Sequence, residues 1–99
     1  MNGRSTNPRV LYPGSFDPIH LGHVDIIEQA AELFGSVVVA VMHNHAKATG
    51  LFPVDERIDL ARESLAHVER VEVVAQTGLA VQAAQRCDVD FIVKGLRTA

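Results

Sequence analysis

The 99-residue sequence predicts one α/β domain built on a doubly wound, Rossmann-like parallel sheet. Three observations lead to this fold class. Short apolar runs alternate with amphipathic runs in the order βαβαβαβ, which favours parallel strands joined by crossover helices on both faces. The run from Val37 to Val41 is apolar without interruption, as is typical of a strand buried on both faces. Apolar residues make up 47% of the chain, enough for the core of a small domain.

The first half of the chain contains two predicted strands and one predicted helix. Residues 1–8 are polar and are expected to be a flexible start, followed by a strand at residues 9–12 and a helix at residues 21–34. Gly35 stands where a helix commonly ends. A second strand is predicted at residues 36–42, and the polar residues after it, 43–50, are expected to form a loop. The helical spacing comes from the apolar stripe Ile27, Ala30, Ala31 and Phe34.

The second half repeats the pattern with weaker signals. Pro53 favours the start of a helix, since proline suits the first helical turn. A strand is predicted at residues 71–75, and Glu72 within it indicates a position near a sheet edge. A third helix is expected at residues 79–86 and a fourth strand at residues 91–93. The inward stripe of the second helix consists of Val54, Ile58, Ala61 and Leu65.

Composition excludes several classes of function. The net charge of −3 argues against a general nucleic-acid or membrane surface, and no apolar run reaches membrane-spanning length. The single cysteine, Cys87, excludes an internal disulfide and fits a cytoplasmic protein. His43 and His45 lie two residues apart with no nearby Cys or Glu, which argues against a dedicated protein metal site.

Residues that could carry chemistry follow each predicted strand. Because ligands bind beyond the carboxyl ends of parallel strands, we expect these segments to meet at one edge of the sheet. Two histidines flank Gly22 at the predicted start of the first helix, where unpaired N–H groups favour anions such as phosphate. The four segments are Ser15 to His23, His43 to Lys47, Thr77 to Ala80 and Lys94 to Arg97.

Two motifs together resemble a known enzyme family. His20-Leu21-Gly22-His23 resembles the (T/H)xGH signature of the nucleotidyltransferase superfamily. The preceding Tyr12-Pro13-Gly14-Ser15-Phe16-Asp17-Pro18 is similar to the opening of the phosphopantetheine adenylyltransferase family, and Lys94-Gly95-Leu96-Arg97 to that family's second nucleotide-contacting motif. The resemblance implies the HxGH nucleotidyltransferase fold and transfer of the adenylyl group of ATP to 4′-phosphopantetheine, which yields dephospho-coenzyme A and pyrophosphate.

The resemblance also implies roles for individual residues. His23 and Lys47 would act in catalysis. The residues implied in ATP binding are Ser15, Phe16, His20, His23, Gly95, Leu96 and Arg97. Those implied in phosphopantetheine binding are Ser15, Lys47, Ala80 and Lys94. The Phe16 ring could equally pack in the core. The family further implies Mg²⁺ carried with ATP, no metal held by the protein alone, and a homohexamer.

Two alternatives stay open at this point. The first is another nucleotidyltransferase of the same fold, which would transfer a cytidylyl group or act on nicotinamide mononucleotide; relatives of those kinds have histidine at the position of His20, where phosphopantetheine adenylyltransferases often have threonine. The second is a non-catalytic nucleotide-binding fragment. Family members continue well past the KGLR motif, so residues 9–99 are expected to lack the C-terminal part of the nucleotidyltransferase domain and to associate through an open fourth strand.

Overall fold

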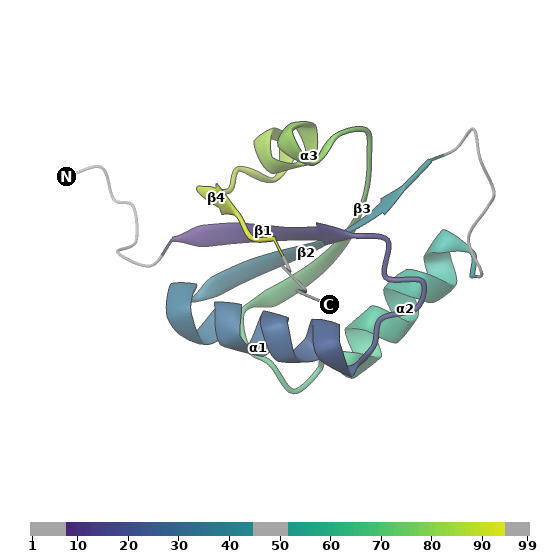
Figure 1. Cartoon of the computed structure of the whole chain (residues 1–99), viewed down its shortest axis with the longest axis horizontal. Helices are drawn as coiled ribbons and strands as arrows, with labels where there is room; N and C mark the ends of the chain where they lie inside the picture. Colours follow the sequence, from purple (N-terminus) through teal and green to yellow (C-terminus); the bar gives the residue numbers. More distant parts are fainter. Residues whose placement is uncertain (1–7, 45–51, 95–99) are drawn as a thin grey trace.

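A computed structural model, which describes residues 8–44 and 52–94, contains one parallel sheet between two layers of helices (Figure 1). The order of the described strands is β3-β2-β1-β4. Helices α1 and α2 contact one face of the sheet and α3 contacts the other, so the predicted doubly wound arrangement is confirmed. In chain order the elements are β1 (Arg9–Gly14), α1 (Leu21–Phe34), β2 (Ser36–His43), α2 (Val54–Ser64), β3 (Val71–Thr77), α3 (Ala80–Cys87) and β4 (Phe91–Ile92).

The core lies on both sides of β2, as its unbroken apolar run predicts. Every side chain from Val37 to Val41 is at most 1% exposed. Alternate residues of a strand point to opposite faces, so the run divides between two clusters. Val37, Val39 and Val41 join the cluster that contains Ile27 of α1 and Ala61 of α2, whereas Val38 and Ala40 join Leu11 and Ala83 on the side of α3.

Element boundaries differ from the prediction mainly where strands pair. β1 continues through Pro13 and Gly14, which lie opposite Ala40 and Val41 of β2, although these residues are usual turn formers. β3 likewise reaches Thr77 because it pairs with β2 as far as His43. β4 ends at Ile92 rather than Val93, and α3 begins one residue later than predicted. The bounds of α1 are as predicted, and β3 is an edge strand with Glu72 exposed.

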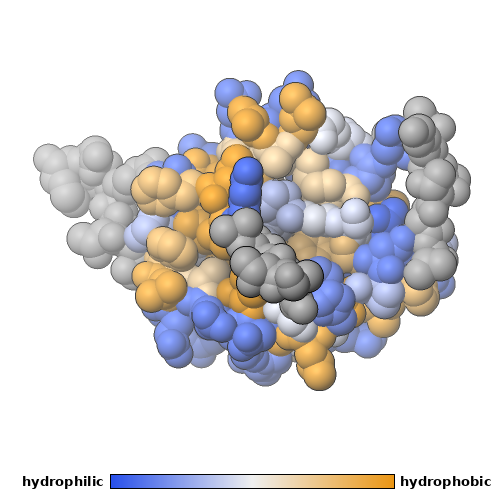
Figure 2. Space-filling view, in the orientation of Figure 1, coloured by the Kyte–Doolittle hydropathy of each residue, from blue (hydrophilic) through white to orange (hydrophobic). Residues whose placement is uncertain are grey.

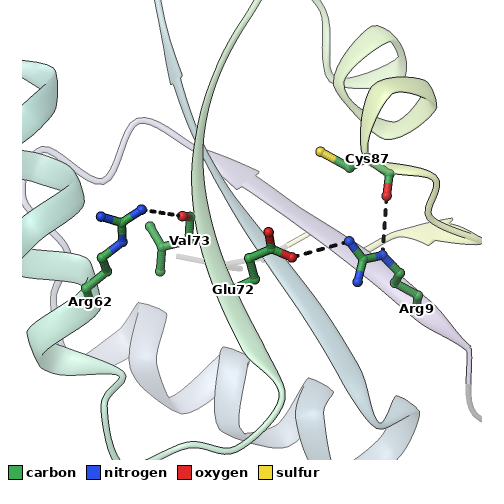
Figure 3. A network of polar contacts seen from close by, with 5 residues as sticks. All are labelled: Arg9, Arg62, Glu72, Val73 and Cys87. Atoms are coloured by element: carbon green, nitrogen blue, oxygen red, sulfur yellow. Dashed lines mark hydrogen bonds and ion pairs between the residues drawn. The ribbon is translucent and has the colours of Figure 1, made fainter.

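The amino end of the sheet is tied together by Arg9, the first residue of β1 (Figure 3). Its guanidinium donates to the Glu72 carboxylate of β3 and to the Cys87 carbonyl at the end of α3, both at 3.3 Å. Its main-chain N–H donates to the Asp90 carboxylate at 2.9 Å, and the Asp90 N–H donates back to the Arg9 carbonyl at 2.7 Å. One residue of β1 therefore links β3, the end of α3 and the residue that precedes β4.

The outward side of α1 is hydrophilic and forms the lower face of the molecule in Figure 2. Its exposed polar residues are Asp25, Glu28, Gln29 and Glu32. Large apolar side chains that remain exposed are scattered over several elements: Leu21, Leu33, Leu79, Val81 and Phe91. Among the described residues, none of the helices has the length and apolarity needed to cross a membrane.

Candidate functional site

The strand order defines where a ligand should bind. From β1 the chain passes through α1 to β2 and β3 on one side, and α3 then returns it to β4 on the other side of β1. In open α/β sheets, a crevice forms beyond the carboxyl ends of the two strands at which the order reverses. Those strands are β1 and β4. Ser15 follows the first of them and Lys94 follows the second, and both side chains are exposed.

The loop between β1 and α1 is shaped by a buried aromatic ring. Phe16 adopts a left-handed backbone conformation, with φ of 46°, and its side chain is only 2% exposed. Its ring lies so close to Gly14 that a Cβ there would come within 3.0 Å of it. A side chain at this position would therefore press on the Phe16 ring, which glycine avoids as the loop turns back over the end of β1. The ring takes part in core packing, which leaves the main chain of Phe16 as the part available to a nucleotide.

Helix α1 begins with two histidines that cap each other. His20 is the N-cap residue, and its Nδ1 accepts a hydrogen bond from the Gly22 N–H at 3.0 Å. The His23 Nδ1 accepts from the His20 N–H at 3.1 Å. Two main-chain donors that a helix start usually leaves unpaired are thus satisfied by imidazole nitrogens.

These caps determine the tautomer of both rings. A neutral imidazole carries its proton on the nitrogen that does not accept, and here Nδ1 accepts in both residues. The donor group of each ring is therefore Nε2–H. The two rings stack with centroids 3.7 Å apart, and His23 also meets the edge of Phe16 at 4.8 Å. Imidazole donors of known tautomer, packed in fixed positions, suit hydrogen bonding to phosphate oxygens.

The electrostatics of the α1 N-terminus also favour an anion. A helix start carries a partial positive charge, which acidic side chains in the first turn would offset. The first turn of α1 contains no acidic residue. The first turn of α2, at the same edge of the sheet, contains Asp55 and Glu56. Of these two helices, only α1 has no carboxylate in its first turn to offset the partial positive charge of its N-terminus.

Other predicted residues lie at this edge but outside the histidine cluster. Ala80 is the first residue of α3, and the loop before it is held by the Gln82 side chain, which accepts from the Leu79 N–H at 2.9 Å. Lys94 follows the end of β4, next to Val93, whose N–H donates to the Leu11 carbonyl of β1 at 2.8 Å. Lys47, Gly95, Leu96 and Arg97 lie outside the described residues, so their predicted roles stay predictions.

Sequence reasoning missed two residues that shape the site. Arg57 of α2 donates to the Ser15 carbonyl at 3.1 Å, and the Asp17 carboxylate accepts from the Phe52 N–H at 2.8 Å. Asp17 lies inside the recognised motif, but its partner cannot be read from spacing. Arg57 belongs to the polar side of a helix and has no distinguishing signal in the sequence.

No group of three or more His, Cys, Asp or Glu side chains that could hold a metal ion occurs in residues 8–44 and 52–94. The side chains grouped at the start of α1 are imidazoles with Nδ1 engaged by the main chain, and not the oxygen ligands that Mg²⁺ prefers. These residues do not fit a magnesium ion held by the protein alone, and no chemical step is assigned to one here.

Comparison with known proteins gives consistent results. Residues 11–99 match the model of the cytidylyltransferase-like family. The phosphopantetheine adenylyltransferase of Synechococcus sp. (strain CC9902) is 53% identical over 89 residues, which are 90% of this chain and 54% of that protein. The phosphopantetheine adenylyltransferase of Gloeobacter violaceus is 52% identical over 87 residues, 88% of this chain and 53% of the relative. The chain thus spans about half the length of the curated relatives it matches.

A solved structure supports the fold independently. The crystal structure of protein Rv1636 from Mycobacterium tuberculosis H37Rv superposes with a TM-score of 0.56 at 17% identity, covering 93% of this chain and 74% of that one. At this identity the likeness concerns the fold alone. The family match is much more specific, because it extends from β1 through both histidines to the last residue. On that match, the chain belongs to the cytidylyltransferase-like family.

Proposed function

We propose that this chain forms the phosphate-binding half of a phosphopantetheine adenylyltransferase, which transfers the adenylyl group of ATP to 4′-phosphopantetheine. The observation that carries the proposal is the pair of mutually capped histidines at the start of α1, with both protons on Nε2. Relatives of that name are 44–53% identical over about nine tenths of this chain, which supports the same substrates here.

In the proposed reaction, an oxygen of the acceptor phosphate forms a bond to the α-phosphorus of ATP, and the bond from that phosphorus to the oxygen bridging to the β-phosphate breaks. Pyrophosphate leaves with the electron pair of the broken bond. His23 donates Nε2–H to an α-phosphate oxygen, where negative charge grows in the transition state. His20 donates to a neighbouring phosphate oxygen, and the α1 N-terminus adds its partial positive charge. Together these groups hold the nucleotide in line for attack.

The remaining residues divide between the two substrates. Lys47 neutralises the acceptor phosphate and supports the transition state, and Lys94 and Ala80 bind the acceptor. Ser15 lies between the two substrates. Gly95, Leu96 and Arg97 bind ATP. Mg²⁺ would accompany ATP and help to neutralise its phosphates, which requires few protein ligands. The proposal further includes a homohexamer in the cytoplasm, and neither nucleic acid nor membrane as a partner.

The test is a pyrophosphate-release assay of the full protein with matched substrate pairs. We expect release with ATP plus 4′-phosphopantetheine, and none with ATP alone, with CTP plus the same acceptor, or with ATP plus nicotinamide mononucleotide. Release with either of the last two pairs would assign the chain to a sister activity. Binding of ATP without release from any pair would make it a nucleotide-binding module. Mass measurement in solution tests the hexamer.

A further inference from the structure

A ring of contacts joins the loop after β1 to the start of α2. The Asp17 carboxylate accepts from the Phe52 N–H at 2.8 Å. The Phe52 carbonyl accepts from Arg57 Nε at 3.0 Å, and the Ser15 carbonyl accepts from Arg57 Nη1 at 3.1 Å. Both polar groups of the Phe52 main chain are thereby held, one by each side chain. The ring closes through the main chain from Ser15 to Asp17.

Phe16 is the residue that this ring encloses. Its left-handed conformation is unfavourable for a residue with a side chain by about 1–2 kcal/mol, so surrounding contacts must maintain it. The ring of hydrogen bonds supplies such contacts on both sides of Phe16, at the Ser15 carbonyl and at the Asp17 carboxylate. The Phe16 side chain then meets His23 edge-on, with ring centroids 4.8 Å apart. A displacement of this loop would therefore reach the His23 imidazole directly.

The chemistry of the bridge requires arginine. Two nitrogens of one planar guanidinium reach two carbonyls that lie 37 residues apart in the chain, Ser15 and Phe52. A lysine has one nitrogen on a flexible stem and cannot reproduce this fixed fork. Arg57 is half-buried, so solvent offers only partial compensation if one of its contacts is lost.

We propose that Arg57, together with Asp17, is a positioning residue for adenylyl transfer: it clamps the Phe52 main chain to the loop after β1, so that Phe16 holds the His23 imidazole in its working place. The proposal rests on the proposed function and adds to it. Arg57 acts through Phe16 and His23 and touches no reacting atom. A role confined to anchoring α2 would affect folding without changing the imidazole.

The test compares two arginines of the same helix in the full protein. Arg57→Lys removes the fork, and Arg62→Lys is the matched control, because Arg62 also donates to a main-chain carbonyl, that of Val73, at 3.1 Å (Figure 3). We expect Arg57→Lys to lower kcat about 10- to 100-fold, since small displacements of a catalytic group cost that much, with less than threefold change in KM for ATP. Arg62→Lys should retain kcat, although both variants lower Tm.

Two further measurements make the outcome decisive. The ¹⁵N–¹H spectrum of the imidazoles, recorded without substrate and assigned with His23→Asn, should show the His23 signals shifted in Arg57→Lys and unshifted in Arg62→Lys. Asp17→Asn keeps an oxygen that can accept from the Phe52 N–H. It should therefore have a higher kcat than Asp17→Ala, and its imidazole signals should shift less. This second pair of variants decides the matter if Arg57→Lys does not fold.

Unshifted His23 signals in Arg57→Lys, or an equal loss of kcat in Arg62→Lys, would overturn the inference. Its failure can be distinguished from failure of the proposed function. If the unsubstituted protein transfers no adenylyl group, the proposed function is wrong, but the ligand-free spectra still report whether Arg57 positions His23.

Discussion

The two ends of the sheet use polar groups in different ways. At the amino end, Arg9 of β1 forms hydrogen bonds with Glu72 of β3, with Cys87 of α3 and with Asp90, which precedes β4. At the carboxyl end, His20 and His23 each accept a main-chain N–H through Nδ1, which places the proton of the neutral ring on Nε2. The amino end therefore uses its polar groups for stability, whereas the carboxyl end carries the histidines for which phosphate binding is proposed.

Parallel topology is the physical origin of this division. All four described strands run the same way, so every loop that follows a strand gathers at one end. Those loops present helix N-termini, which favour anions. The helix C-termini and the starts of the strands lie at the other end. There, carbonyl groups at helix ends accept hydrogen bonds from side chains of the protein, as the Cys87 carbonyl does from Arg9.

The largest expected effect is on catalysis at the carboxyl end. Replacing His23 with alanine removes one donor to the growing charge, and kcat should fall about 100- to 1,000-fold. The substitution also removes the acceptor of the His20 N–H. Because this N–H is exposed and water can replace the lost acceptor, the free energy of unfolding should fall by no more than about 1 kcal/mol. Steady-state kinetics and urea denaturation measure the two quantities.

The control for this substitution is His67→Ala. His67 lies between α2 and β3 and pairs with Glu28 of α1, at 2.5 Å. Its removal should leave kcat unchanged. A loss of folding that matches the loss of activity in His23→Ala would make His23 a structural residue and erase the contrast between the two ends.

The next effect concerns the loop before α3, also at the carboxyl end. Gly78 has φ of 84°, and a Cβ there would lie 2.3 Å from Gln82 Oε1. Gly78→Ala should lower the free energy of unfolding by about 1–2 kcal/mol, because alanine resists this conformation and Gln82 must leave the Leu79 N–H. Urea denaturation of the variant, with Gln82→Ala added to relieve the collision, separates backbone strain from contact loss. An undiminished stability of Gly78→Ala would show that the loop rearranges freely.

A smaller effect is expected at the amino end. Asp90→Ala removes the carboxylate that accepts from the Arg9 N–H at 2.9 Å, and the free energy of unfolding should fall by about 1 kcal/mol. Asp90→Asn, which keeps an acceptor oxygen, should lose less. Neither should change kcat, since the contact lies at the end of the sheet opposite the histidines. A reduced kcat with unchanged stability would reverse the assignment of roles.

The smallest effect is expected for Glu72→Gln. The pair formed by Arg9 and Glu72 is exposed, with 41% and 58% of the side chains accessible, and exposed pairs contribute about 0–1 kcal/mol. The stability difference from the unsubstituted protein should shrink further in high salt, because mobile ions screen exposed charges. Denaturation at low and high salt measures this, and a difference that does not respond to salt would indicate that the contact is not mainly ionic.

The sequence predicts local structure well where one face of an element is buried. The apolar stripe of α1 and the unbroken run of β2 predict those elements, because burial imposes periods that are visible in the residues themselves. The prediction of the strand ends was less accurate. Pro13 and Gly14 are typical turn residues, yet pairing with β2 keeps them in β1, and this partner lies 27 residues away in the chain.

By itself, the sequence determined the alternation of strands and helices and the family motif, since each depends on residues that are close in the chain. Only the tertiary structure decided that β4 lies beside β1, that both His20 and His23 accept through Nδ1, and that Arg57 bridges Ser15 and Phe52. The strand order and the Ser15 bridge join segments far apart in the chain, and the histidine caps depend on the three-dimensional geometry of a helix start. Packing and hydrogen-bond direction set such contacts, and neither leaves a periodic trace in the sequence.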